Sequence, residues 1–219
     1  MLSKKGDAAV DFNFDQLESA KRYKLLTGLV IPRPIAWTTT LSAGGVVNAA
    51  PFSFFNVLGD DPPIVMISIE NRDAGPLKDT ARNILETKEF VVNLVDEDTA
   101  EKMHACSLDY PPGASEADAV GLATAPSCSV KPPRLADSPV SLECRLHTHL
   151  DMGTRQLVIG TVHWLHVRDG VIEPDTLRVR MENYHPIGRL YANRYTRTRE
   201  QFALEANAYV EARARLGKA

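Results

Sequence analysis

The segment from residue 31 to residue 40, IPRPIAWTTT, places an arginine between two prolines and follows it with a tryptophan and three threonines. Pro32 and Pro34 fix their own φ, and Pro34 also holds Arg33 in extended geometry, so the arginine is positioned before any ligand binds. The following side chains alternate between two faces of a strand, with Ile35, Trp37 and Thr39 on one and Ala36, Thr38 and Thr40 on the other. Taken alone, this pattern indicates an edge strand whose threonines reflect β-propensity.

A second stretch with both polar and aromatic side chains, NAAPFSFFN, covers residues 48–56. Pro51 donates no ladder hydrogen bond, so we expect an edge or a bulge there, where the bent chain exposes backbone polar groups. The residues around it mix amides and hydroxyls with phenyl rings: Asn48, Ser53, Phe54, Phe55 and Asn56. This mixture suits a planar heterocycle with polar edges, and it also suits a barrel end packed with phenylalanine and capped by polar groups.

Histidines gather in two later stretches, CRLHTH and HWLH, and raise the question of a metal site. In a strand, His147 and His149 share a face that Cys144 does not. His163 and His166 face opposite sides of their own strand. Since no three ligands converge locally, the sequence predicts no metal site.

Signatures of several other chemistries are missing from the sequence. There is no GxSxG elbow, and Cys106 beside His104 in a helix-like stretch is a weak indication of nucleophilic catalysis. Neither GxGxxG nor the P-loop signature occurs, so the glycine-rich turns that cradle phosphates in Rossmann and P-loop proteins are absent.

The composition is that of one globular domain. Of the 219 residues, 44% are hydrophobic and 24% charged, close to the averages for folded proteins. We expect a single domain over 1–219, with its core at about 14–195 and a helical tail at 198–219. The net charge of -3 argues against nucleic-acid binding, because such domains usually carry a basic surplus.

The sequence also indicates where the protein works. No window approaches the ~20 apolar residues of a membrane span, so no membrane association is expected. Cys106, Cys128 and Cys144 form no CxxC pair, which is typical of reduced cytosolic thiols. We therefore expect a cytoplasmic protein without a structural disulfide.

The elements that must position the candidate residues are mostly strands. Apolar spacing and capping predict helices at 14–24 with Asn13 as the N-cap, at 77–88, at 97–108 and from Thr198 onward. Strands are predicted at 34–42, 46–52, 63–70, 89–95, 140–151 and 154–172, the first two joined by a hairpin at Gly44 and Gly45. The loop at 109–127 is long enough for a lid or a dimer-contacting arm, with a plain surface excursion as the alternative. This order predicts a small antiparallel barrel with helices at its edges and disfavours a doubly wound sheet.

Several of these segments together resemble the flavin reductase-like FMN-binding split-barrel family, in the branch that includes flavoredoxin-type proteins. The resemblance runs from about residue 14 to about residue 195. Its most specific part combines Pro-Arg-Pro-Ile-Ala-Trp with Asn-x-Ala-Pro-x-Ser-x-Phe, and the other matching segments are KDTARNI, EFVVNLV, PVSLECRL and GRLYANRY. It implies a six-stranded antiparallel split β-barrel that forms a homodimer and holds FMN near the subunit interface.

The resemblance also implies which residues bind FMN. The matched positions are Arg33, Trp37, Thr38, Thr39, Asn48, Ala50, Ser53, Phe54, Lys78, Asp79 and Thr80, with Arg72, His185, Arg189 and Tyr195 as weaker candidates. Trp37 would lie near the ring, and the Lys-Asp-Thr segment near the phosphate or the ribityl chain. A phosphate with close to two negative charges needs hydroxyl or amide donors and a cation, and these residues supply both kinds. Because faces alternate, Thr39 and its two neighbours cannot all contact the ligand from one face.

The implied function is that of an FMN-binding oxidoreductase, an NAD(P)H-dependent flavin reductase that passes electrons to flavin, a protein partner or a small acceptor. The chemistry takes place on the flavin ring, so no catalytic acid or base is required of the protein. Two alternatives are an FMN-containing electron carrier without strong activity toward NADH or NADPH, and a split barrel that lost its ligand. The intact hydroxyl and amide positions count against the second of these.

Overall fold

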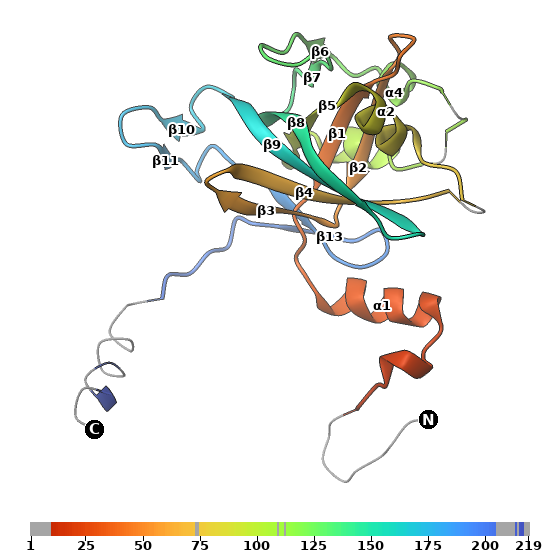
Figure 1. The fold of residues 1–219 in the computed structure, drawn as a ribbon. Coiled ribbons are helices and arrows are strands. Elements are labelled where there is room, and N and C mark those ends of the chain that lie inside the picture. The colour runs from red at the N-terminus through yellow and green to blue at the C-terminus, as the bar shows by residue number, and fades with distance from the viewer. Residues whose placement is uncertain are drawn as a thin grey trace.

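The computed structural model describes residues 10–72, 75–108, 110–111, 113–204, 213 and 215–216. A strongly twisted antiparallel sheet of seven strands, in the order β2-β1-β5-β8-β9-β4-β3, forms the body (Figure 1). Its strands are β1 Ala36–Leu41, β2 Val47–Phe52, β3 Phe55–Asp60, β4 Pro63–Glu70, β5 Glu89–Leu94, β8 Val140–Asp151 and β9 Arg155–Val167. The mainly β, antiparallel fold is thus confirmed, with one strand more than the resemblance implied because β3 pairs with β4.

Short strands pair outside this sheet. These pairs are β6 Thr124–Ala125 with β7 Arg134–Leu135, β10 Ile172–Glu173 with β11 Arg178–Val179, and β12 Ile187–Arg189 with β13 Tyr195–Arg197. The β12–β13 hairpin is fixed to the segment that leads into β1, because Arg33 and Arg189 exchange backbone hydrogen bonds of 3.0 and 2.8 Å. The C-terminal part of the chain is therefore joined to the IPRPIAWTTT segment.

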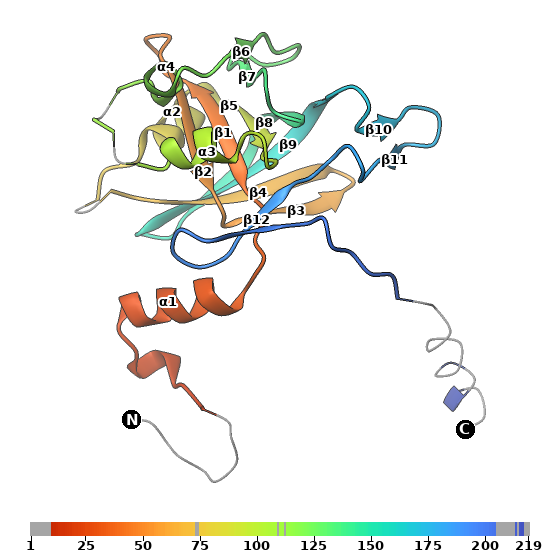
Figure 2. The same cartoon turned by 180° about the vertical axis from the view of Figure 1, so that it is seen from behind.

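The helices are α1 Ser19–Leu29, α2 Asp79–Thr87, α3 Ala100–Ala105 and α4 Glu116–Val120. In both views α1 stands apart from the sheet, whereas α2, α3 and α4 lie against the end formed by β1 and β2 (Figures 1 and 2). Among the helices that the structure describes, none is long and apolar enough to cross a membrane.

Several predicted helix boundaries are wrong. The helix predicted at 14–24 is a 3-10 turn at Phe14–Gln16, capped by the Asn13 side chain, followed by α1, because Leu17 and Glu18 have extended backbone angles. The helix predicted at 97–108 shrinks to α3, since the Thr99 hydroxyl and the Asp96 carboxylate hold the preceding residues in a turn.

The predicted C-terminal helix is only partly described. Residues 198–204 are not helical, which contradicts the expected start at Thr198. Residues 213, 215 and 216 are helical, and the other residues of the tail lie outside the described part of the chain.

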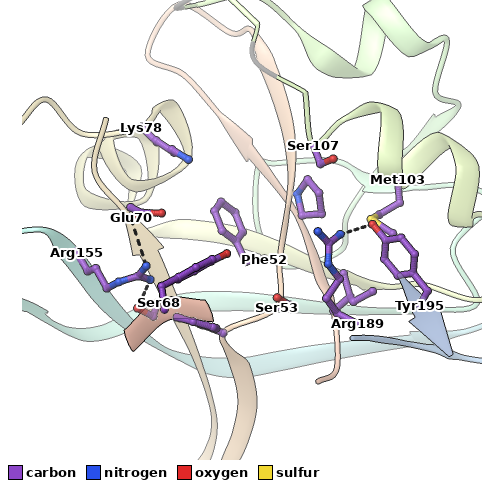
Figure 3. A pocket seen from close by; sticks show the side chains of 14 residues that line it. Phe52, Ser53, Ser68, Glu70, Lys78, Met103, Ser107, Arg155, Arg189 and Tyr195 are labelled. Carbon is purple, nitrogen blue, oxygen red and sulfur yellow. Dashed lines mark hydrogen bonds and ion pairs between the residues drawn. The ribbon is translucent and has the colours of Figure 1, made fainter. Parts of the chain in front are cut away.

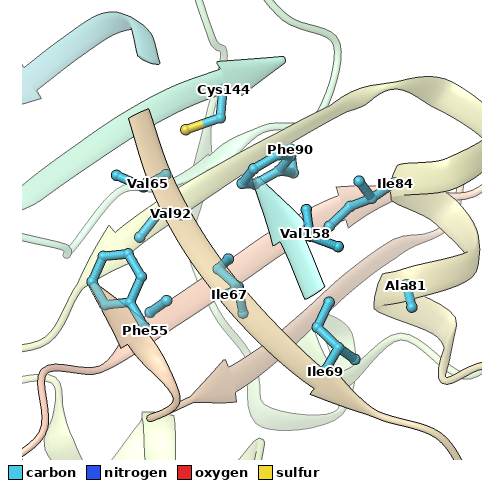
Figure 4. Packing of buried hydrophobic residues seen from close by; sticks show 11 residues of the cluster. Phe55, Val65, Ile67, Ile69, Ala81, Ile84, Phe90, Val92, Cys144 and Val158 are labelled. Carbon is cyan, nitrogen blue, oxygen red and sulfur yellow. The ribbon is translucent and has the colours of Figure 1, made fainter. Parts of the chain in front are cut away.

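Strand β1 lies inside the sheet, so the expectation of an edge strand is wrong. It pairs with β2 on one side and with β5 on the other. One of its faces places Ala36 in the apolar cluster between the sheet and α2, whose other members include Ile67, Phe90 and Val158 (Figure 4). The other face places Trp37 in a second cluster beside α3. Both faces of β1 are therefore buried.

Strand β2 is an edge strand of this sheet, as Pro51 predicted. Its hairpin with β1 is also confirmed, with Leu41 opposite Val47 across the turn. Since an edge strand exposes part of its backbone, this strand is suited to line a pocket.

Candidate functional site

Two neighbouring pockets lie along β2, one of about 200 Å³ and one of about 110 Å³. They share Pro51, Phe52, Lys78 and Ser107, so together they form one trough, whose parts we call the larger and the smaller pocket. The NAAPFSFFN and LKDT motifs, distant in sequence, both contribute to its walls.

The larger pocket has aromatic walls with cations at two sides, and Figure 3 shows Phe52 between them. On one side Arg155 lies with its Cζ atom 4.8 Å from the centroid of the Phe54 ring and pairs with Glu70 at 3.4 Å. On the other side lies Arg189. The remaining rings in the walls belong to Tyr23 and Tyr195. Rings and guanidinium groups in this arrangement can stack on a flat ligand and interact with its charge.

Arg189 and Tyr195 belong to the β12–β13 hairpin and hold each other in the wall of the larger pocket. A guanidinium nitrogen of Arg189 donates to the Tyr195 hydroxyl, and Arg189 Cζ lies 4.8 Å from the centroid of the Tyr195 ring. His104 Nδ1 lies 3.0 Å from the same hydroxyl. The hairpin therefore fixes a cation and a phenol at the pocket.

Arg33 is buried behind this wall. Its Nη1 donates to the carbonyl oxygens of Thr27 at 2.6 Å and Val30 at 2.9 Å, both near the C-terminal end of α1. Its Nη2 donates to the carbonyl oxygen of Leu190 at 2.7 Å, and its Nε lies 3.5 Å from Ser53 Oγ. Burial lowers the pKa of this guanidinium from its ordinary value. Arg33 thus joins α1, the β12–β13 hairpin and the end of β2.

The smaller pocket is polar and contains the buried carboxylate of Glu116. This carboxylate accepts from the backbone N–H of Ala49 at 3.1 Å. The amide of Asn48 is satisfied with its nitrogen 3.2 Å from both Glu116 oxygens and its oxygen accepting from Thr80 Oγ1 at 2.9 Å. Burial raises the pKa of Glu116, although backbone donors, including that of Ala49, oppose the change. Because Glu116 begins α4, the loop at 109–127 is joined to β2 here.

Asp79 and Lys78 stand where α2 begins and differ in their partners. Asp79 is buried and forms ion pairs with Arg72 at 3.0 Å and with Arg82. Lys78 is the N-cap residue of α2 and lines both pockets, and within the described residues it forms no ion pair. Lys78 therefore places a cation at the junction of the two pockets.

The walls of the trough include most of the residues predicted from the sequence. The predicted residues that line it are Asn48, Ala50, Ser53, Phe54, Arg72, Lys78, Asp79, Thr80, Arg189 and Tyr195. Residues that were not predicted also line the trough, among them Tyr23, Ser68, Glu70, Met103, Ser107, Tyr110, Glu116 and Arg155. Of these, Arg155 follows from strand register, because it lies opposite Glu70 in the ladder of β4 and β9.

The remaining predicted residues line neither pocket. Trp37 is 2% exposed and lies in the second apolar cluster. Thr38 Oγ1 donates to the carbonyl oxygen of Ala36 at 3.4 Å, and Thr39 Oγ1 donates to that of Pro133 at 2.6 Å. The backbone carbonyl oxygen of His185 accepts a hydrogen bond from the backbone N–H of Glu97. The structure therefore keeps these side chains, like that of Arg33, apart from the walls of the trough.

Comparison with known families and structures identifies the family and the fold. Residues 28–195 match the family described as the flavin reductase like domain. The chain is 39% identical to the 2-nitrobenzoate 2-nitroreductase NbaA of Pseudomonas fluorescens, with a TM-score of 0.83 over 89% of this chain and 95% of that one. It is 33% identical to nitrilotriacetate monooxygenase component B from Bacillus cereus, with a TM-score of 0.85 over 91% and 100%. A Shewanella frigidimarina protein with a split barrel domain, 22% identical, has a TM-score of 0.71 over 87% and 94%, which shows the same fold.

Proposed function

This chain belongs to the flavin reductase-like family, and from that premise we propose that it is an FMN-binding oxidoreductase. In this proposal it is a flavin reductase that takes electrons from NADH or NADPH and passes them to flavin or another small acceptor. The observation that carries the proposal is the trough along β2, in which an aromatic pocket continues past Lys78 into a polar one. FMN likewise combines a flat ring with a polyol chain and a phosphate.

The residues of the trough fit these parts. Tyr23, Phe54 and Arg155 offer two rings and a guanidinium group to the flavin ring in the larger pocket. In the smaller pocket, Glu116 and Asp79 carboxylates suit the hydroxyl groups of a polyol and repel a phosphate. Lys78 and the first N–H groups of α2 therefore serve the phosphate.

When bound, FMN supplies hydride transfer at the N5 atom of its ring. The part played by this chain is to orient the ring and to stabilise the negative charge that reduction places on it. Arg189 carries a permanent positive charge in the wall of the larger pocket, and its bond to Tyr195 fixes its direction. Arg33 acts from behind the wall by joining α1 to the β12–β13 hairpin. Trp37 and Thr39 hold β1 against neighbouring segments.

A double substitution, Lys78→Ala with Thr80→Ala, tests the cofactor site. Removal of the cation and of a neighbouring hydroxyl should lower the affinity for FMN by about 100-fold, since a hydrogen bond to a charged group contributes roughly 1.5–3 kcal/mol. Flavin content after purification and quenching of FMN fluorescence measure the effect, and circular dichroism checks the fold. Lys102→Ala, which removes a surface lysine that pairs with Asp137, is the matched control. Unchanged flavin occupancy in the double variant would show that the phosphate lies elsewhere.

An electron carrier with little activity toward nicotinamides is the second candidate, because flavin binding alone serves both functions. Anaerobic stopped-flow mixing of the FMN-loaded protein with NADH, and separately with NADPH, distinguishes them. We expect rapid bleaching of the flavin absorbance with at least one nicotinamide. A protein that binds FMN but is bleached by neither is a carrier.

We also propose a cytoplasmic homodimer. Exposed apolar side chains lie on α1 at Leu26 and Leu29 and on the edge strand β3 at Val57 and Leu58. Free cysteines at three positions fit a reducing compartment. Size-exclusion chromatography with light scattering should give twice the mass of the chain, and a monomeric mass would refute the dimer.

A further inference from the structure

A cluster of metal-ligating side chains lies outside the trough. Cys128, Glu143 and His166 each offer one ligand atom, and these atoms all lie within 4.8 Å of one another. Cys128 is on the loop before β7, Glu143 is on β8 and His166 is on β9, and none of them lines either pocket of the trough. We propose that these three residues form a binding site for a zinc ion.

Glu143 can bind a metal with the loss of only one of its four hydrogen bonds. One oxygen, Oε2, accepts from the backbone N–H and from the hydroxyl of Ser129, both at 2.6 Å. The other, Oε1, accepts from the backbone N–H of Cys128 at 2.7 Å and lies 2.6 Å from His166 Nε2. A metal ion that replaces the proton between Oε1 and Nε2 keeps the other three bonds. These bonds then orient the carboxylate from outside the ligand shell.

The geometry needs a small adjustment. Two ligands at about 2.1 Å from a tetrahedral ion are roughly 3.4 Å apart, so Oε1 and Nε2 must separate from 2.6 Å by less than an ångström. His166 has a side chain that is 20% exposed, and Cys128 is exposed, so both can move toward the ion and give it a path from solvent. The three protein ligands leave a fourth position for water.

The charges also favour a divalent ion. The side chain of Glu143 is completely buried, and within the described residues its one ion-pair partner is His166. A buried carboxylate is stable only when its charge is compensated. A thiolate and a carboxylate together neutralise two positive charges. Thiolate and imidazole ligands select zinc over magnesium or calcium, which prefer oxygen.

Cobalt is the probe for this site, because it adopts the geometry of zinc and is coloured. Untagged protein without flavin is titrated with Co²⁺ under reducing, anaerobic conditions. We expect one equivalent to bind with visible bands of tetrahedral cobalt and a thiolate charge-transfer band, and zinc to remove them. Since Cys106 and Cys144 are buried, this band should belong to Cys128. Trp164, whose ring lies 6.5 Å from that of His166, should report binding by quenched fluorescence.

Variants decide whether these three residues form the site. Cys128→Ser should abolish the charge-transfer band, and Ser129→Ala should weaken cobalt binding by about 10- to 100-fold while keeping the band. His166→Gln should also weaken binding, whereas His163→Gln, an exposed histidine on the same strand, should not. The proposal is overturned if the wild type shows no band, if Cys128→Ser keeps it, or if the two histidine variants behave alike. None of these results depends on flavin binding.

Discussion

Substitution of Arg33 separates two roles that this residue could have, a ligand of the cofactor or an anchor of the pocket walls. Its two terminal nitrogens donate to different elements. Nη1 donates to the carbonyl oxygens of Thr27 and Val30, and Nη2 donates to that of Leu190. A lysine has one nitrogen, which can replace Nη1 at the end of α1 but cannot also reach the hairpin. Arg33→Lys therefore removes the bond to Leu190 and keeps the charge.

The expected magnitudes follow from these bonds. A hydrogen bond from a charged group contributes roughly 1.5–3 kcal/mol, so Arg33→Lys should lower the free energy of unfolding by about 2 kcal/mol. Arg33→Met removes the three bonds to carbonyl oxygens and should lower it by about 5 kcal/mol, less if water reaches the freed carbonyl groups. Since domains of this kind are stable by about 5–15 kcal/mol, the lysine variant should remain folded.

Urea unfolding followed by circular dichroism measures the stability, and quenching of FMN fluorescence measures the affinity of the same samples. If Arg33 is an anchor, stability and FMN affinity should fall together, and further in Arg33→Met than in Arg33→Lys. Arg155→Lys is the control, because this arginine lines the larger pocket and its ion pair with Glu70 is partly exposed. Loss of FMN affinity in Arg33→Lys with less than about 0.5 kcal/mol of lost stability would refute the anchor and support a direct contact.

Two further predictions follow from buried titratable groups. Glu116→Gln should leave stability at pH 7 unchanged or raise it by up to about 1 kcal/mol, because a raised pKa means that folding favours the neutral acid. In the wild type, the stabilisation from the protonated Glu116 is lost as the pH rises through the raised pKa. The free energy of unfolding, measured with urea between pH 5 and 8, should therefore fall with pH in the wild type and change less in the variant. In the variant, Asn48 can turn so that its amide oxygen accepts from the new amide. In the absence of metal, a thiol reagent should label Cys128 in the folded protein. Burial raises the pKa of Cys106 to about 12 and also raises that of Cys144, so both should react only in urea, and fast native labelling of either would contradict their burial.

Local signals in the sequence were sufficient for the strands and for the β1–β2 hairpin. Gly45 has a φ of 82° in the turn between them, a conformation that glycine adopts without strain. Pro51 marked β2 as an edge strand because a proline cannot complete a ladder on both sides. The alternation of β8 and β9 likewise predicted two long strands, which pair over most of their length.

The position of β1 inside the sheet was not predictable from its own residues. Its threonines suggested a polar face, yet their hydroxyl groups are satisfied within the protein, Thr39 by Pro133 and Thr40 by Asn83. The side-chain amide of Asn93 donates hydrogen bonds to the backbone oxygen of Trp37 and to Thr39 Oγ1. These partners come from distant segments, so only the folded chain shows how the hydroxyl groups of Thr39 and Thr40 are satisfied.

The site residues that belong to sequence motifs were predicted. Those that reach the site only through the pairing of strands were missed. The NAAPFSFFN and LKDT segments line the trough because one is an edge strand and the other begins a helix. Arg155 carries no motif and reaches the larger pocket because β9 pairs with β4.

The proposed metal site also could not be predicted from the spacing of residues within single strands. Spacing within single strands argued against a metal, because His163 and His166 face apart and no three ligands lie on one face of one strand. The pairing of β8 with β9 reverses the conclusion that no metal site forms. Glu143 lies opposite Trp164, and His166 is two positions further along β9 on the same face. The loop that contains Cys128 then folds back onto Glu143, which binds its backbone N–H. Three ligands from three segments converge only because a bulge between Glu143 and Cys144 sets this register, so an inserted or deleted residue near that bulge should abolish cobalt binding.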